Sequence, residues 1–234
     1  RVLDFSTMEA GHLQLQYEVI DLRRTLEDLI YVEAVTAHTK GLKLCAVIDP
    51  ALPRQVICDG DRLRQVLLNL IRNAVKFTEN GEVDLRVRYE REGEATSLAF
   101  EVIDTGVGMS PEDCSRLFEP FTQADSSTTR AVTGTGLGLS ISRHLVALLG
   151  GSLSVESLLG SGSHFNFVVP VRIQPNTKGR TPKPVLKGQR VGVLDRHGAF
   201  VDFVRTVVEP LGGQVLAVGD EAEREQRRAA VAAQ

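Results

Sequence analysis

The chain has 234 residues, of which 42% are hydrophobic and 24% charged, and its formal net charge is -3. This composition predicts a soluble globular protein with a proper core. The mild charge balance lacks the electrostatic signature of proteins that bind nucleic acid or anionic membranes. No apolar run reaches the roughly 20 residues that a membrane-spanning helix needs. The three cysteines, Cys45, Cys58 and Cys114, are odd in number and far apart, which predicts reduced thiols in the cytoplasm.

The first predicted elements are helices separated by a strand. Residues 1–20 predict the end of a helix followed by an extended link, in which apolar residues alternate as in a strand. Asp21 can cap the next helix, which Gly41 ends. A strand is predicted over 42–49, and a second complete helix over 61–77.

The middle of the chain predicts strand hairpins rather than a strict alternation of strands and helices. The predicted order is a hairpin (81–90 and 96–104), a long connection (105–137), a helix (137–151) and a second hairpin (151–157 and 162–171). This mixed order predicts an α+β fold, a sandwich of a helical layer on a sheet.

The helix predicted over 61–77 has an apolar face and a polar face. The polar face holds Arg62, Gln65, Asn69, Asn73 and Lys76. Asparagine has poor helix propensity, but its amide oxygen can bind a hard cation, and a lysine one turn later can contact a phosphate. The face therefore predicts one wall of a site for a magnesium-bound phosphate group. An ordinary solvated helix face is the alternative.

A second candidate wall lies at the end of the strand predicted over 96–104. Asp104 ends this strand, and Gly106 and Gly108 follow, which allows a tight turn with the carboxylate pointing inward. Such a carboxylate can accept a hydrogen bond from an exocyclic amine such as that of adenine. An ordinary Asx-turn is the alternative.

The third candidate element is the long connection that ends in "VTGTGLGLSI" at 132–141. Glycines before a helix let backbone N–H groups approach a phosphate, although glycine-rich turns that bind nothing are common. The connection carries apolar anchors at Phe118 and Phe121 and a cation at Arg130. Connections beyond about 12 to 15 residues are typical of functional lids or of disorder.

Four motifs occur in order: "NLIRNAVKFT", "DTGVGM", "LFEPFTQAD" and "GTGLGL". Together they resemble the N, G1, F and G2 boxes of the sensor histidine kinase catalytic domain, in the ATP-binding superfamily of gyrase, Hsp90 and MutL. The resemblance covers about residues 21–172. It implies the Bergerat fold, a two-layer α/β sandwich with a mixed, mostly antiparallel sheet and helices on one face. The opening "LDFSTMEAG" resembles the end of the second dimerisation helix of hybrid histidine kinases.

The resemblance implies a role for each matching residue. Asn73 would coordinate magnesium, Asn69 would lie beside it near the phosphates, and Lys76 would contact the phosphate chain. Asp104 would bind the adenine amino group. Arg130 would face the γ-phosphate. The other implied ATP-binding residues form the floor of the pocket and the lid: Phe77, Gly106, Gly108, Phe118, Phe121, Gly134, Thr135, Gly136, Leu137 and Gly138.

The implied activity is transfer of the ATP γ-phosphoryl, with ATP and Mg²⁺ as cofactors, to a histidine on a dimerisation helix in two-component phosphorelay signalling. We expect that helix to precede residue 1, because no histidine here has the acceptor's context: His12, His38, His144, His164 and His197. This segment alone should therefore bind ATP without phosphorylating itself. The implied partners are the chain's own dimerisation helices in a homodimer and a receiver domain or response regulator. The implied location is the cytoplasm, with the full-length protein anchored in the inner membrane.

The remaining residues predict a linker and a second, incomplete domain. The prolines and basic residues of 173–188 are typical of a linker. Residues 189–234 predict a strand, a helix and a strand, and they resemble the start of a response-regulator receiver. A working receiver usually has two adjacent acidic residues after its first strand, but here Arg196 follows Asp195. The hypothesis is a truncated receiver-like segment, and specifically a pseudoreceiver.

Two other functions stay open beside the kinase. An ATPase that hydrolyses ATP itself would need a general base such as glutamate where Asn69 stands, which argues against hydrolysis. A catalytically silent regulator could keep the fold and dock to another histidine kinase. Thr133, which stands where the family usually has glycine, and Arg196 keep this alternative open.

Overall fold

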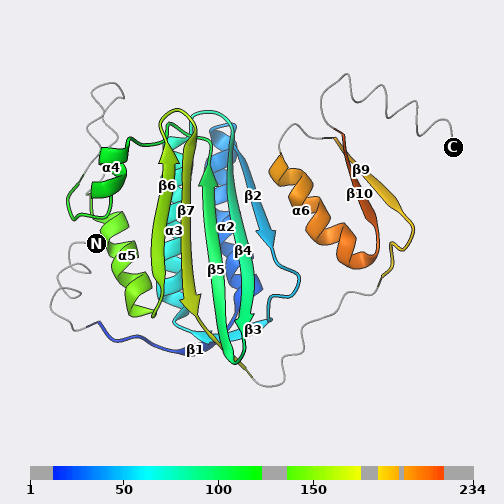
Figure 1. Ribbon diagram of the computed structural model, residues 1–234, viewed down its shortest axis with the longest axis horizontal. Coiled ribbons are helices and arrows are strands. Elements are labelled where there is room, and N and C mark those ends of the chain that lie inside the picture. Colours follow the sequence, from blue (N-terminus) through cyan, green and yellow to red (C-terminus); the bar gives the residue numbers. More distant parts are fainter. Residues whose placement is uncertain (1–12, 123–135, 175–183, 195–197, 219–234) are drawn as a thin grey trace.

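The computed structural model describes residues 13–122, 136–174, 184–194 and 198–218 (Figure 1). Its main body is a five-stranded sheet with the order β2-β4-β5-β7-β6, in which only β2 and β4 are parallel neighbours. The strands are β2 (Lys43–Ile48), β4 (Glu82–Glu92), β5 (Ala95–Asp104), β6 (Ser152–Leu158) and β7 (Gly162–Pro170). The predicted mixed, mostly antiparallel sheet is confirmed.

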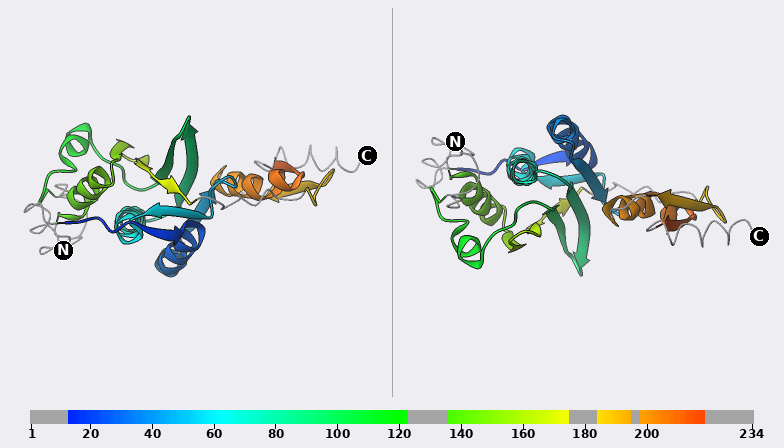
Figure 2. Two further views of the ribbon diagram at one scale, coloured as in Figure 1. Left: turned by 90° about the horizontal axis from the view of Figure 1, so that it is seen from below. Right: turned by 90° about the horizontal axis from the view of Figure 1, so that it is seen from above.

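Three helices form the second layer, on one face of this sheet (Figures 1 and 2). They are α2 (Leu22–Thr39), α3 (Gly60–Phe77) and α5 (Gly138–Leu148). Asp21 caps α2, as predicted, by accepting a 3.2 Å hydrogen bond from the backbone of Arg24. Asp59 caps α3 in the same way through Arg62. Within the described part of the chain, no helix is both long and apolar enough to span a membrane.

The core lies between the sheet and the helices. The apolar face of α3 is buried in full: Leu63, Val66, Leu67, Leu70, Ile71 and Ala74. Phe100 of β5 and Phe167 of β7 stack on the sheet side, with ring centroids 4.6 Å apart. Because α3 buries this face, its opposite side is left for the predicted polar residues.

A small second sheet was not predicted. Its order is β1-β3-β8, and the strands are β1 (Glu18–Asp21), β3 (Gln55–Cys58) and β8 (Arg172–Ile173). Strands this short carry little periodic signal. The strand-like alternation was predicted from Leu13 onward, but β1 begins only at Glu18. Leu13 and Leu15 alternate because they pack against the core, without strand pairing.

The described part of the long connection contains a short helix, α4 (Pro111–Arg116), which the sequence did not predict. After the main body, the chain forms β9 (Arg190–Leu194), α6 (Gly198–Val208), a 3-10 helix η1 (Glu209–Leu211) and β10 (Gln214–Val218). β9 and β10 pair in parallel, which agrees with the predicted strand–helix–strand unit. Helix α6 lies against the edge strand β2 (Figure 1).

Candidate ATP-binding site

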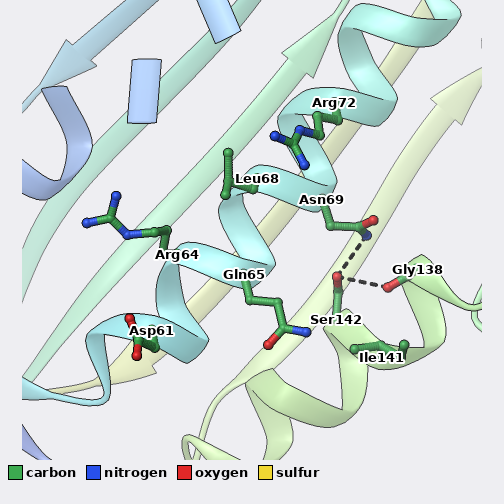
Figure 3. A pocket seen from close by; sticks show the side chains of 9 residues that line it. All are labelled: Asp61, Arg64, Gln65, Leu68, Asn69, Arg72, Gly138, Ile141 and Ser142. Carbon is green, nitrogen blue, oxygen red and sulfur yellow. Dashed lines mark hydrogen bonds between the residues drawn. The ribbon is translucent and has the colours of Figure 1, made fainter. Parts of the chain in front are cut away.

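The polar face of α3 is turned toward the N-terminal end of α5 (Figure 3). Asn69, Asn73 and Lys76 are all partly exposed on this face, as the helical spacing predicted. The Asn69 amide donates a 2.9 Å hydrogen bond to the Ser142 hydroxyl, which in turn donates to the Gly138 carbonyl at 3.1 Å. Asn69 therefore joins the two helices.

A pocket of about 340 Å³ opens between α3 and α5 (Figure 3). It includes Asn69 and Gly138 but none of the residues around Asp104. Among its basic residues, Arg72 forms a 2.8 Å ion pair with the buried carboxylate of Glu33 on α2. The lining residues are Asp61, Arg64, Gln65, Leu68, Asn69, Arg72, Gly138, Ile141 and Ser142.

Close packing at the start of α5 explains one of the predicted glycines. A Cβ atom at Gly138 would lie 2.5 Å from the Asn69 side-chain oxygen, so a larger residue here would require the Asn69 amide to move. Among the described residues, no side chain caps this helix end, and the N-cap residue Leu137 is apolar and buried. The first backbone N–H groups of α5 therefore lie next to Asn69, with no capping side chain from the part of the chain that the structure describes.

Asp104 lies at the end of β5 and is buried. Its Oδ1 atom accepts a 2.9 Å hydrogen bond from the Gly106 backbone, so the Asx-turn considered above is present. A carboxylate has several further acceptor positions, and the turn uses only one of them. Burial raises the pKa of the Asp104 carboxyl above its ordinary value, while hydrogen bonds from the Gly106 and Ser163 backbone act in the opposite direction.

The loop after Asp104 contacts the C-terminal end of α3. The Phe77 carbonyl accepts a 3.3 Å hydrogen bond from the Val107 backbone. A Cβ atom at Gly106 would lie 2.5 Å from that same carbonyl, and one at Gly108 would overlap the Leu158 carbonyl. Both glycines are thus required for these close approaches, which the sequence did not predict beyond the tight turn itself. Lys76 lies beside this junction, with its ammonium 5.0 Å from the centre of the Phe77 ring.

Phe121 and Gly136, which lie on either side of residues 123–135 in the long connection, contact each other at the start of α5. The Phe121 backbone donates a 3.1 Å hydrogen bond to the Gly136 carbonyl. Both residues have positive φ angles, 62° and 66°. Phe118 is buried and stacks under the Arg143 guanidinium at 5.1 Å, as expected of an anchor. The Phe121 ring is 68% exposed, so this residue holds the connection through its backbone.

Three predicted site residues, Arg130, Gly134 and Thr135, lie outside the described residues, as does Thr133. Among the described residues, no group of three His, Cys, Asp or Glu side chains could hold a metal. Asn73 does fit a cation ligand, because its amide is partly exposed and makes no hydrogen bond within the described ranges. The sequence reasoning missed Ser142, although it lies one turn after Gly138 on the helix face toward Asn69.

Comparisons with known proteins agree with this fold. Residues 58–173 match the family described as histidine kinase-, DNA gyrase B- and HSP90-like ATPase. The sensor histidine kinase GacS of Pseudomonas protegens is 40% identical over 215 residues, which cover 92% of this chain and 23% of that protein. The signal transduction histidine-protein kinase BarA of Escherichia coli is 41% identical over 201 residues, 85% of this chain and 22% of BarA.

A solved structure also resembles the chain over nearly its whole length. It is the crystal structure of full-length ShkA in complex with AMPPNP, with a TM-score of 0.81 and 32% identity. The match covers 96% of this chain and 45% of ShkA. The chain spans less than a quarter of the length of GacS and BarA. Through residues 58–173 the chain belongs to the histidine kinase-, DNA gyrase B- and HSP90-like ATPase family, and it carries the ATP-binding catalytic domain of the hybrid histidine kinases.

Proposed function

We propose that this domain transfers the γ-phosphoryl group of ATP to a histidine on a dimerisation helix of the whole protein. The observation that carries the proposal is the meeting of three elements. The Asp104 loop contacts the C-terminal end of α3, while the uncapped start of α5 contacts Asn69 in the middle of α3. A buried carboxylate and a helix N-terminus at opposite ends of one polar helix face suit a nucleoside triphosphate, with its adenine amine at one and its phosphates at the other.

Each residue of the site has a proposed role. Asp104 accepts the adenine amine, and Gly106 and Gly108 let the backbone form the pocket floor. Lys76 contacts the phosphate chain, and Asn69 lies beside it. Further proposed contacts with ATP come from the end of α3, from the long connection and from the start of α5: Phe77, Phe118, Phe121, Arg130, Gly134, Thr135, Gly136, Leu137 and Gly138. Of these, Arg130, Gly134 and Thr135 lie outside the described residues.

We propose that Asn73 holds Mg²⁺, which would neutralise charge on the phosphates when bound. The chain's own groups supply position and charge rather than a covalent intermediate. Asn69, tied to Ser142, fixes the distance between α3 and α5, so that Lys76 and the α5 N–H groups act on the same phosphates. Asn69 is also a poor general base, because an amide does not take up a proton at neutral pH, which disfavours attack by water.

The related kinases favour phosphotransfer over a silent regulator. The proposed partners are the dimerisation helices of a homodimer and a receiver domain or response regulator. Residues 189–234 are proposed to be a receiver-like segment, with Arg196 after Asp195 as the mark of a pseudoreceiver. We place the reaction in the cytoplasm, with the full-length protein anchored in the inner membrane.

The test uses the full-length protein, radiolabelled ATP and Mg²⁺. We expect label on histidine, stable to alkali and lost in acid, in the wild type and in Asn80→Ala, but not in Asn73→Ala. Asn80 is an exposed asparagine outside the helix and serves as the matched control. ATP binding without labelling would overturn the proposal in favour of the silent regulator. Release of inorganic phosphate without labelling would instead favour the ATPase.

A further inference from the structure

Lys40 makes an unusual set of contacts for a lysine that follows a helix. It is the C-cap residue of α2, and its side chain reaches the C-terminal end of α3. Its ammonium group donates hydrogen bonds to the carbonyls of Val75 at 2.6 Å, Lys76 at 3.1 Å and Thr78 at 3.0 Å. An ammonium has three N–H donors, so all three are used on one stretch of backbone.

These contacts complete the end of α3. The last carbonyls of a helix have no partner within the helix and need one from elsewhere. The Ala74 carbonyl accepts from the backbone and hydroxyl of Thr78, and the Phe77 carbonyl accepts from Val107. The carbonyls of Val75, Lys76 and Thr78 accept hydrogen bonds from the Lys40 ammonium group. A cation is also the favoured charge at a helix C-terminus.

The same turn carries one end of the proposed nucleotide site. Lys40 binds the carbonyl of Lys76 itself, and Phe77 lies between Lys76 and Thr78. The Phe77 carbonyl accepts a hydrogen bond from the Val107 N–H. Val107 follows Gly106, whose own N–H holds the Asp104 carboxylate. Lys40 is thus joined to Asp104 through a short series of backbone contacts, although it does not line the pocket between α3 and α5.

We propose that Lys40 is a positioning residue for nucleotide binding: it fixes the C-terminal turn of α3, and through it the Asp104 loop and Lys76. This inference rests on the proposed ATP site. It predicts that loss of the ammonium weakens nucleotide binding by more than any loss of stability explains. A purely structural lysine would lower stability and leave the affinity of the folded protein unchanged.

The chain offers a matched control, because a second contact joins the same two helices away from the Asp104 loop. Glu33 of α2 pairs with Arg72 of α3 at 2.8 Å, and its side chain is 5% exposed. Glu33→Gln weakens this helix–helix contact but leaves the end of α3 intact. It should therefore lower stability without changing affinity for ADP.

The experiment measures the affinity for ADP and the thermal unfolding midpoint of the wild type, Lys40→Met, Lys40→Arg and Glu33→Gln. We expect Lys40→Met to bind ADP about tenfold more weakly, since hydrogen bonds to charged groups are lost. Lys40→Arg, which keeps charge and donors, should recover most of that affinity. Lys40→Gln, with a neutral donor, replaces Lys40→Met if the latter does not fold.

Two results would overturn the proposal, and neither can be confused with failure of the ATP site itself. Wild-type affinity in folded Lys40→Met or Lys40→Gln would show that the lysine only stabilises. Equal losses of affinity in Glu33→Gln and Lys40→Met would show a general effect of helix packing. If the wild type does not bind ADP at all, the proposed function fails first. Besides the change in ADP affinity, we expect hydrogen exchange at the Val107 amide to be faster in Lys40→Met than in the wild type. Glu33→Gln should leave this exchange rate unchanged.

Discussion

The two ends of the proposed ATP site are built from different kinds of contact. At the Asp104 end, backbone N–H groups make the contacts: Gly106 donates to the Asp104 carboxylate, and Val107 donates to the Phe77 carbonyl. At the α5 end, the helices are joined through side chains, chiefly the Asn69–Ser142 hydrogen bond. Side chains change rotamer easily, whereas backbone contacts of this kind need the fold to move. We infer that the Asp104 end is formed before nucleotide arrives, while the α5 end can adjust to it.

Because of this difference, we expect one end of the site to set the affinity for nucleotide and the other end to set the rate of phosphoryl transfer. Contacts that are equal in the bound state and the transition state set affinity, and contacts that strengthen in the transition state set the rate. The adenine is far from the transferred phosphoryl group, so the Asp104 end should control nucleotide affinity. The α5 end and Asn73 should control how the phosphates are bound with magnesium and how fast the phosphoryl group is transferred.

The largest effect is expected from Asp104→Ala. We expect ADP affinity to fall by about 100-fold, because a buried charged acceptor for the adenine amine is lost. Glu112→Ala, an exposed carboxylate on α4, should leave affinity unchanged. Calorimetric titration of both variants checks this. An Asp104→Ala protein that is folded and binds within threefold of the wild type would contradict the assignment of the adenine end.

A smaller effect is expected from Asn73→Ala on the purified domain. Without magnesium, ADP affinity should equal that of the wild type, because the Asp104 end is untouched. With magnesium, the wild type should gain about tenfold more affinity than the variant, since one oxygen ligand is missing. Paired titrations with and without Mg²⁺ measure this gain. Equal gains in both proteins would remove Asn73 from the metal site.

A pH dependence should follow from Asp104. Its carboxyl pKa is raised by burial, so the free protein takes up a proton here at a higher pH than an exposed aspartate does. Only the ionised form accepts at both oxygens, so affinity should be full above the raised pKa and fall as the pH drops through it. Titrations from neutral to mildly acidic pH, beside Asp104→Asn, test this. The variant should bind more weakly and without this slope, and equal slopes would refute the assignment.

The smallest effect is expected from Ser142→Ala. It removes the acceptor of the Asn69 amide, and one neutral hydrogen bond contributes about 1 kcal/mol. ADP affinity should stay within about twofold, whereas the phosphotransfer rate of the full-length protein should fall by about threefold. A larger loss of affinity than of rate would reverse the proposed division between the two ends.

The sequence predicted the parts of the site that local patterns define. The apolar spacing of α3 placed Asn69, Asn73 and Lys76 on one face, and the glycines around Asp104 indicated the tight turn. These features depend on helical periodicity and on glycine conformation, which act over a few residues.

The parts that could not be predicted depend on contacts between distant residues. Lys40 meets α3 across 35 to 38 positions, and Asn69 meets Ser142 across 73. Neither pair has a local signal. The exposed ring of Phe121 was missed for a related reason: its positive φ and its bond to Gly136 turn the side chain away from the core.

Calorimetric titration of the domain with a non-hydrolysable ATP analogue, with and without magnesium, tests the central claim most directly. The account predicts binding in both conditions, tighter with magnesium, and lost in Asp104→Ala. The absence of binding at millimolar nucleotide, with the protein folded, would contradict it and make the four motifs a retained scaffold.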